Sequence, residues 1–266
     1  MKQISILGCG WLGMPLAKQL IQKGYTIKGS TTTKAKLEIL KNEGISSFLI
    51  SLQANDISHE FVDFLENSEI LIINIPPGLR GSSGESFVSK MENFIPFVEK
   101  SSVKKVLFVS STSVYADENQ IVTEETIPNP ETESGKQLLK VENLLLQNTN
   151  FQSTILRFGG LIGEDRHPIN FLAGRNNIEN PQAPINLIHQ QDCIEIIQKI
   201  IEKEVWNTVL NAVAPFHPTR KKYYTEKALE QNLALPQFNE NEHSVGKTVS
   251  SNKLIQLLNY QFKNLG

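Results

Sequence analysis

The chain has 266 residues, and its 26 lysines and arginines nearly balance its 28 aspartates and glutamates, for a formal charge of −2. This balance argues against general nucleic-acid binding, which depends on a surplus of basic side chains. No apolar run approaches the ~20 residues that cross a bilayer, and the two cysteines form neither a disulfide framework nor a metal-ligand spacing.

The first residues lack the long apolar stretch and small-residue cleavage site of a signal peptide. We therefore expect a cytoplasmic protein that acts on a small molecule. Nucleic-acid partners, membrane partners and a metal site are not expected, and the sequence does not define the oligomeric state.

Strand-like and helical segments alternate over the first 158 residues. A strand at 2–7 is followed by a helix at 11–23, which ends at Gly24, the residue typical of a left-handed helix cap. Strands that alternate with helices predict right-handed crossovers and an α/β fold with a doubly wound parallel sheet. The further predicted segments are a strand at 25–29, a helix at 34–42, a strand at 46–50, a helix at 57–66, a strand at 69–75, a helix at 85–100, a strand at 104–110, a helix at 134–147 and a strand at 151–158.

The alternation breaks after residue 158, where residues 159–184 are rich in Gly, Pro and Asn. We predict that residues 1–158 and 185–214 form a Rossmann domain. Residues 159–184 and 215–266 are predicted to form a small C-terminal substrate lobe. The segments expected in this part are strands at 185–188 and 207–213 and helices at 193–201, 220–232 and 251–258.

Gly8, Gly10 and Gly13 form a Gly-x-Gly-x-x-Gly motif at the joint of the first strand and the first helix. In a dinucleotide site the first glycine makes the tight turn, the second lets the backbone approach a pyrophosphate, and the third lets helix and strand pack closely. The helix N-terminus then offers N–H groups and a positive dipole end. The strand and helix on either side favour a dinucleotide site over a structural turn.

The end of the second strand selects between the two nicotinamide cofactors. An acidic residue there binds the ribose 2′-hydroxyl of NAD, but residues 29–34 read Gly-Ser-Thr-Thr-Thr-Lys. Hydroxyl groups and Lys34 suit a 2′-phosphate, because hydrogen bonds to a charged phosphate are the strong ones. The sequence therefore favours NADP, with NAD as the alternative.

Four segments, in the family's order, resemble the extended short-chain dehydrogenase/reductases: the glycine motif, 109–115 (Val-Ser-Ser-Thr-Ser-Val-Tyr), 156–163 (Leu-Arg-Phe-Gly-Gly-Leu-Ile-Gly) and 186–192 (Asn-Leu-Ile-His-Gln-Gln-Asp). Residues 166–168, 172–175 and 214–218 resemble an atypical, NAD(P)-dependent epimerase/dehydratase-like branch. The resemblance covers residues 1–213 and implies an NAD(P) site at the carboxyl edge of the sheet. The cofactor-binding residues expected on this basis are Gly8, Gly10, Trp11, Leu12, Gly13, Ser30, Thr31, Thr32, Lys34, Leu52, Asn74, Ile75, Pro76, Ser110 and Phe158.

The catalytic positions depart from the family's pattern. The family uses a Ser or Thr, a Tyr, and a Lys four residues later, which lies on the same helix face and favours the phenolate. Ser111 matches the first position, but Ser134 and Leu138 occupy the usual Tyr and Lys positions. The resemblance places Tyr115 near the substrate. Without a lysine partner its pKa is expected near ~10, so it would act as a proton donor or a packing residue.

Three further patterns carry less information. Tyr223 and Lys227 form a Tyr-x-x-x-Lys spacing in the predicted lobe, which we interpret as coincidence, and Asp192 is expected to cap the helix that follows His189. Basic residues also gather in the lobe, where they suit an anionic small molecule or form a solvated face. These residues are Arg166, His167, Arg175, His217, Arg220, Lys221 and Lys222.

Three hypotheses follow. The first is an NADP-dependent oxidoreductase or epimerase in which Ser111 orients the reacting oxygen and Tyr115 or water supplies the proton. The second is a non-catalytic NAD(P)-binding redox sensor or partner-binding module. The third, a Rossmann-like scaffold without a cofactor, conflicts with the three glycines. Loss of the Tyr and Lys would slow the first, because one positioned acid contributes about 10²–10⁴-fold.

Overall fold

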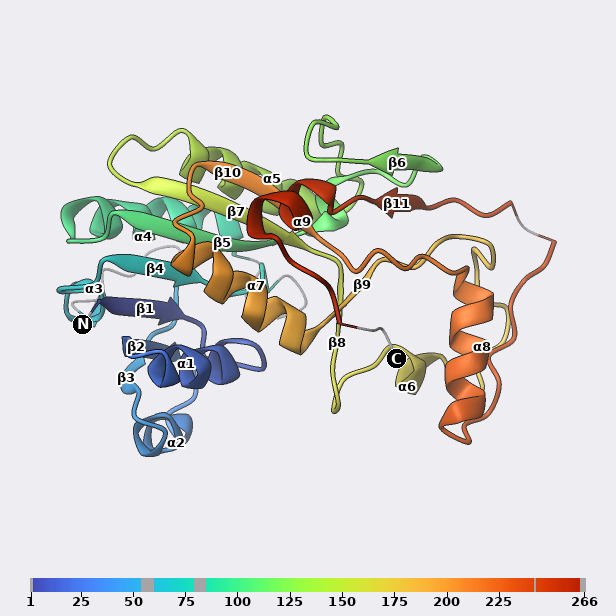
Figure 1. The fold of residues 1–266 in the computed structure, drawn as a ribbon, viewed down its shortest axis with the longest axis horizontal. Coiled ribbons are helices and arrows are strands. Elements are labelled where there is room, and N and C mark those ends of the chain that lie inside the picture. The colour runs from blue at the N-terminus through green and yellow to red at the C-terminus, as the bar shows by residue number, and fades with distance from the viewer. Residues whose placement is uncertain (1, 54–59, 79–84, 242, 264–266) are drawn as a thin grey trace. The chain divides into compact units, whose positions relative to one another are not determined.

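A computed structural model describes residues 2–53, 60–78, 85–241 and 243–263. Its largest element is a seven-stranded sheet with the strand order β10-β7-β5-β4-β1-β2-β3 (Figure 1). The pairs β1–β2, β1–β4, β2–β3 and β4–β5 are parallel. This arrangement confirms the predicted α/β fold. The strands of the sheet are β1 Gln3–Leu7, β2 Thr26–Thr31, β3 Ser46–Leu49, β4 Ile70–Ile73, β5 Lys105–Ser111, β7 Gln152–Phe158 and β10 Thr208–Ala212.

The helices that flank the sheet fall into two groups. Helix α4 packs against both α3 and α5, while Gln19 of α1 donates a hydrogen bond of 3.1 Å to Gln198 of α7. The predicted helix at 57–66 begins at Glu60, and its first three predicted residues lie outside the described residues. These helices are α1 Gly13–Gln22, α2 Lys36–Asn42, α3 Glu60–Leu65, α4 Phe87–Lys100, α5 Glu133–Leu146 and α7 Gln190–Glu202.

The chain divides into two compact units. Unit 1 contains residues 1–111, 132–156 and 194–209, and unit 2 contains residues 112–131, 157–193 and 210–266. The boundaries predicted from the sequence divide the chain by expected function instead. They place residues 112–131 with the Rossmann domain, and that functional division stays a prediction.

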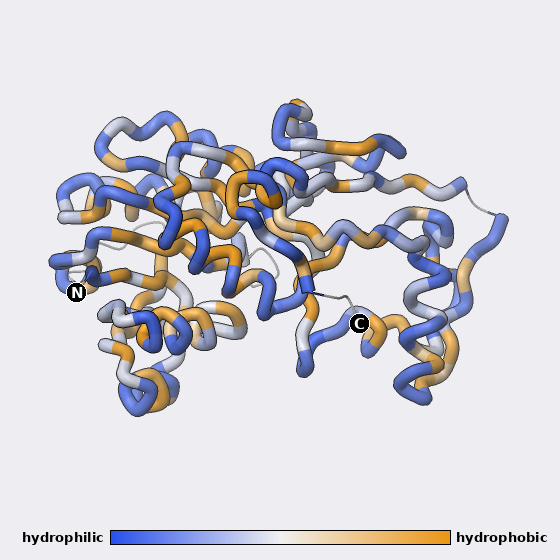
Figure 2. The backbone as a smooth tube through the Cα atoms, viewed as in Figure 1, coloured by the Kyte–Doolittle hydropathy of each residue, from blue (hydrophilic) through white to orange (hydrophobic). Residues whose placement is uncertain are grey.

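The core of unit 1 is built on its central strands. All four residues of β4, Ile70–Ile73, are completely buried, as expected for a parallel strand that is covered on both faces. Figure 2 shows hydrophobic residues gathered along the strands and polar residues on the outer turns of the helices. Gly24 has a φ of +87°, which confirms the left-handed cap after α1.

Unit 2 is built from short elements. Its two parallel strand pairs join β8 (Gly160–Ile162) to β9 (Leu187–His189) and β6 (Gln120–Val122) to β11 (Lys247–Val249). Its short helices are α6 (Ile169–Leu172), α8 (Arg220–Glu230) and α9 (Asn252–Leu258), and a 3₁₀ turn at Thr112–Val114 follows β5. The sequence did not predict β6, β8, β11 or α6, because three or four residues are too few to show a period. The core of unit 2 contains Ile162, Ile169, Ile185, Leu187, Ala214, Tyr223, Tyr224 and Ala228.

The structure corrects the expected role of Asp192. Helix α7 begins at Gln190, so Asp192 lies in the first turn and does not cap the helix. Its Oδ1 atom accepts hydrogen bonds from the Tyr260 hydroxyl at 2.6 Å and the Lys263 backbone N–H at 3.0 Å. Asp192 is completely buried, and it therefore anchors the segment that follows α9. In the part of the chain that the structure describes, no helix is long and apolar enough to cross a membrane.

Candidate dinucleotide site

A cavity of about 380 Å³ lies in unit 1 at the ends of β1, β2, β3 and β4. These strands are parallel, so their carboxyl ends share one edge of the sheet, and open α/β sheets bind ligands at that edge. The cavity is lined by Leu7, Gly8, Cys9, Gly10, Ser30, Thr31, Thr32, Thr33, Lys36, Ile50, Ser51, Leu52, Asn74, Ile75, Pro76, Pro77, Gly78, Phe87 and Lys90.

The three glycines of the motif have different surroundings. Gly8 has a φ of +103°, and a Cβ there would lie 2.4 Å from the Asn74 carbonyl oxygen. A Cβ on Gly13 would lie 2.2 Å from the Gly8 carbonyl oxygen, so both glycines are needed to close the turn. A Cβ on Gly10 would meet no atom within 4 Å. The missing side chain at Gly10 therefore leaves room in the cavity, as a pyrophosphate requires.

Ser30 and Asn74 hold the backbone of this turn. The Ser30 hydroxyl accepts a hydrogen bond of 2.9 Å from the Gly8 N–H, and the Ser30 carbonyl accepts one of 2.7 Å from the Cys9 N–H. Asn74 Nδ2 donates to the Gly8 carbonyl at 3.0 Å. Burial raises the pKa of the Cys9 thiol to about 12. The thiol is therefore protonated at neutral pH and is a packing group, not a nucleophile.

Hydroxyl groups and a lysine surround the cavity at the end of β2. Residues 31–36 contain three threonines and two lysines but no carboxylate. The first residue of α2, Lys36, lines the cavity, whereas the predicted Lys34 does not. The sequence favoured Lys34 because it directly follows the three threonines at the end of the second strand. Lys90 of α4 also lines the cavity and forms an ion pair of 3.0 Å with Glu85.

Nine of the fifteen predicted cofactor residues line the cavity, namely Gly8, Gly10, Ser30, Thr31, Thr32, Leu52, Asn74, Ile75 and Pro76. The other six do not, namely Trp11, Leu12, Gly13, Lys34, Ser110 and Phe158. Leu12 and Phe158 are buried in the core. Sequence reasoning missed Phe87 and Lys90, which come from α4, because no local pattern ties that helix to the ends of the strands.

Ser110 at the end of β5 contacts a buried carboxylate. Its hydroxyl donates a hydrogen bond of 2.5 Å to Glu142 Oε1, and both residues are buried. Ser134, Leu138 and Glu142 follow one another at four-residue intervals on α5, and Leu138 is buried. Lys136 and Lys140 are exposed. The face of α5 to which the resemblance assigns the Tyr and Lys positions therefore carries Ser, Leu and Glu.

Tyr115 lies in a hydrogen-bond network within unit 2. Its hydroxyl donates to Asn211 Oδ1 at 3.0 Å and accepts from an Arg157 nitrogen at 2.6 Å. The Arg157 guanidinium also lies 4.9 Å from the centre of the Tyr115 ring. Burial raises the pKa of Tyr115 although the Arg157 charge opposes the shift, so the phenol stays protonated. Ser111 belongs to unit 1, and the catalytic roles of Ser111 and Tyr115 stay predictions.

Among the residues that the structure describes, no group of three or more His, Cys, Asp or Glu side chains could hold a metal ion. The described polar groups of the unit 1 cavity are instead hydroxyl, amide, lysine and backbone groups. These groups suit a phosphate-bearing ligand, since hydroxyls and backbone N–H groups donate hydrogen bonds and lysines carry positive charge.

Comparisons with known proteins agree with this geometry. Residues 3–127 match the family described as the NAD binding domain of 6-phosphogluconate dehydrogenase. Protein YeeZ from Escherichia coli strain K12 is 31% identical over 265 residues, which cover 99% of this chain and 96% of YeeZ. A putative NAD-dependent epimerase/dehydratase from Methylobacillus flagellatus is 25% identical, with a TM-score of 0.78 over 98% of this chain and 93% of that one. UDP-glucuronic acid 4-epimerase from Bacillus cereus, solved in complex with NAD, is 17% identical, with a TM-score of 0.81 over 98% and 92% of the two chains.

Proposed function

The chain belongs to the family of Protein YeeZ and contains an NAD(P)-binding Rossmann domain with the fold of the extended short-chain dehydrogenase/reductases, and on this premise we propose that it is an NADP-dependent oxidoreductase or epimerase. One observation carries the proposal. The unit 1 cavity joins the open space at Gly10 to a strand end that offers threonines and Lys36 without a carboxylate. The first feature suits a pyrophosphate, and the second suits a 2′-phosphate.

The residues of unit 1 would hold the cofactor in a definite order. The backbone around Gly10 would hold the pyrophosphate, and Thr31, Thr32 and Lys36 would hold the 2′-phosphate of the adenine ribose. Leu52 would lie beside the adenine. The segment from Asn74 to Pro76, which also lines the cavity, would border the remainder of the dinucleotide.

A bound nicotinamide supplies the hydride that this reaction class needs. The chain's own task is to orient the reacting oxygen, which we assign to Ser111, and to provide a proton. Tyr115 keeps its proton, but its hydroxyl already donates to Asn211. Water is therefore the proton source that this arrangement favours.

The substrate that this function suits is a small molecule with an anionic group. Arg220 and Lys247 line a cavity of about 290 Å³ in unit 2. Lys247 already donates to the Tyr115 carbonyl at 2.7 Å and forms an ion pair of 3.0 Å with Asp117. Arginine binds carboxylate and phosphate groups with two parallel hydrogen bonds. Carbonyl compounds that carry a carboxylate or a phosphate are thus the first candidates for assay.

Calorimetric titration of the full chain with NADPH and NADH tests cofactor binding. Gly10→Ala is expected to weaken NADPH binding at least tenfold, since the new methyl group occupies the ligand's space and contacts no protein atom. Its melting temperature should stay near that of the wild type. Gly13→Ala is the matched glycine variant that should unfold more easily. No heat with either nucleotide at millimolar concentration, or unchanged NADPH affinity in Gly10→Ala, contradicts the proposal.

A second function, a non-catalytic NADP-binding sensor or partner-binding module, is favoured by one observation. The hydroxyls of Ser110 and Tyr115 are both engaged by protein groups, and positions 134 and 138 carry Ser and Leu. NADPH oxidation followed by absorbance over a panel of carbonyl compounds separates the two functions. Tight NADPH binding without turnover supports the sensor. Turnover that survives Ser134→Ala supports the enzyme, and its loss in Tyr115→Phe would identify Tyr115 as the proton donor in place of water.

A further inference from the structure

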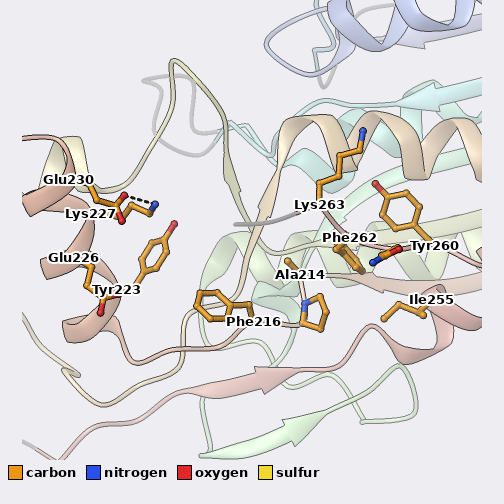
Figure 3. A pocket seen from close by; sticks show the side chains of 12 residues that line it. Ala214, Phe216, Tyr223, Glu226, Lys227, Glu230, Ile255, Tyr260, Phe262 and Lys263 are labelled. Carbon is orange, nitrogen blue, oxygen red and sulfur yellow. Dashed lines mark hydrogen bonds and ion pairs between the residues drawn. The ribbon is translucent and has the colours of Figure 1, made fainter. Parts of the chain in front are cut away.

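Unit 2 contains a larger cavity, of about 600 Å³, which is within the usual size range of small-molecule sites. Four elements contribute to its wall: the segment after β10, helix α8, helix α9 and the segment after α9 (Figure 3). The wall combines aromatic rings with a few polar groups. The lining residues are Ala214, Pro215, Phe216, Tyr223, Glu226, Lys227, Glu230, Ile255, Tyr260, Gln261, Phe262 and Lys263.

Tyr223 and Lys227 place two polar groups at one end of this cavity. Their four-residue spacing, which the sequence alone presented as coincidence, puts both side chains on the same face of α8. Figure 3 shows the Tyr223 hydroxyl and the Lys227 ammonium pointing to the same end of the cavity. The ammonium lies 5.9 Å from the centre of the Tyr223 ring and 2.7 Å from Glu230 Oε2.

The hydrogen bonds of His167 determine where the Tyr223 proton points. The Ile169 backbone N–H donates to His167 Nδ1 at 3.1 Å, so Nδ1 carries a lone pair and the neutral ring carries its proton on Nε2. Nε2 lies 3.0 Å from the Tyr223 oxygen. The Nε2–H group must therefore donate to Tyr223, whose own proton is left for a different acceptor.

Nothing described in the protein accepts that proton. Tyr223 is only 3% exposed, and among the described residues His167 alone lies within hydrogen-bond distance of its hydroxyl. Burial raises the pKa of Tyr223, so the hydroxyl remains a donor at physiological pH. A buried donor without an acceptor is costly, and the cavity that Tyr223 lines is the place where an acceptor fits.

We propose that this cavity binds an uncharged, largely apolar molecule through one carbonyl oxygen, which accepts a hydrogen bond from Tyr223. The apolar body of the molecule packs against Phe216 and Phe262. Phe216 is 52% exposed although its ring borders the cavity, so a bound molecule would also remove its apolar surface from water.

The charges around Tyr223 favour a neutral molecule over an organic acid. Lys227 is already neutralised by Glu230, and Glu226 adds a second carboxylate to the same helix. A ligand carboxylate would be the third negative charge around one ammonium, whereas a carbonyl oxygen adds no charge. Lys263 lines the same cavity from the segment after α9 and not from α8.

This site and the proposed dinucleotide site are lined by residues of different units. Every lining residue belongs to unit 2, while the dinucleotide cavity is formed entirely by unit 1. Titration of this site in the absence of nucleotide therefore tests it alone. NADPH titration tests the other site, so failure of either proposal can be recognised separately.

Fluorine NMR titration of the full chain provides the test, with three probes that share a fluorophenyl body. 4-Fluoroacetophenone carries a carbonyl, 4-fluoroethylbenzene has no acceptor, and 4-fluorobenzoate carries a charge. We expect 4-fluoroacetophenone to bind at least fivefold more tightly than either of the other two, as one hydrogen bond allows. Equal affinity for the first two probes, tighter binding of 4-fluorobenzoate, or binding of none of them at millimolar concentration overturns the proposal.

Variants of α8 locate the binding. Tyr223→Phe should weaken 4-fluoroacetophenone binding about fivefold to tenfold and leave 4-fluoroethylbenzene binding unchanged. Tyr224→Phe, at the neighbouring tyrosine that does not line this cavity, should change neither affinity. Phe216→Ala, at a side chain that is 52% exposed, should weaken both. Unaltered 4-fluoroacetophenone affinity in Tyr223→Phe, or an equal loss in Tyr224→Phe, contradicts the proposed site.

Discussion

The side-chain nitrogen of Asn74 donates a hydrogen bond of 3.0 Å to the carbonyl oxygen of Gly8. The backbone N–H of Asn74 also donates to the Leu7 carbonyl at 2.9 Å. One residue at the end of β4 thus holds the turn that follows β1 through two hydrogen bonds. The shape of the glycine turn therefore depends on the neighbouring strand as well as on its own glycines.

Substitution of Asn74 tests this dependence. Asn74→Ala removes the donor to Gly8 and is expected to lower the free energy of unfolding by about 1 kcal/mol, measured by urea denaturation. Asn74→Asp keeps the side-chain shape but places a carboxylate beside the Gly8 carbonyl and the proposed pyrophosphate position. Its NADPH affinity should fall further than that of Asn74→Ala. An aspartate variant that binds NADPH as tightly as the wild type would contradict the assignment of this turn to phosphate binding.

Lys36 is expected to select NADP. Lys36→Met should weaken NADPH binding about tenfold, as the loss of a charged hydrogen bond implies, while NADH binding stays unchanged. Lys34→Met is the matched control, since Lys34 lies two residues away and does not line the cavity. Calorimetric titration of both variants with both nucleotides makes the comparison. An effect of Lys34→Met equal to that of Lys36→Met would show that overall charge, rather than contact, determines the preference.

Tyr115 is expected to stabilise unit 2. Tyr115→Phe removes the hydroxyl that bonds Asn211 and Arg157, and it should lower the free energy of unfolding by about 1–3 kcal/mol. Tyr115→Leu also removes the ring beneath the Arg157 guanidinium and should be less stable still. Urea denaturation measures both variants. A phenylalanine variant as stable as the wild type would mean that the hydroxyl is held for a different purpose, such as proton transfer.

The stability of the protein should depend on pH through His167. Burial lowers the pKa of His167 below its usual 6.5, Lys227 adds to this shift and Glu230 opposes it. Below pH 6.5 the unfolded chain binds a proton that the folded protein does not, so the contribution of His167 to stability decreases as the pH falls. The same proton would also remove the Nδ1 acceptor of the Ile169 N–H.

Comparison with His167→Gln isolates this contribution from the other titrating groups. The wild type should be more stable than the variant at about pH 7.5, and this difference in unfolding free energy should become smaller as the pH falls to about 5.5. Urea denaturation at the two pH values measures it. A difference that grows as the pH falls would mean that the folded protein favours the protonated ring.

The sequence predicted the sheet of unit 1 and nine of the residues that line its cavity because both follow from sequence patterns. The strands carry apolar runs such as 70–73, and Gly8, Gly10 and Gly13 occur at the spacing that the turn needs. Lys36 and Lys90 could not be selected in this way. The first depends on where α2 begins within one turn, and the second on which helix packs over the edge of the sheet.

The side-chain networks could not be predicted either, because their partners lie far apart in the sequence. Tyr115 bonds Asn211 across 96 residues, and His167 bonds Tyr223 across 56. No local pattern pairs such residues. The Tyr223–Lys227 spacing was visible in the sequence, but its meaning depends on a histidine tautomer that only the hydrogen bonds define.

The pairing of β6 with β11 has a consequence for how the chain matures during synthesis. Asn119 and Gly246 bond each other across 127 residues, and Lys247 donates to the Tyr115 carbonyl. A nascent chain that has left the ribosome only as far as residue 240 lacks the partners that fix this segment. The neighbourhood of Tyr115 can therefore be completed only after residues 246 and 247 have been synthesised, as a late and slow non-local step of folding.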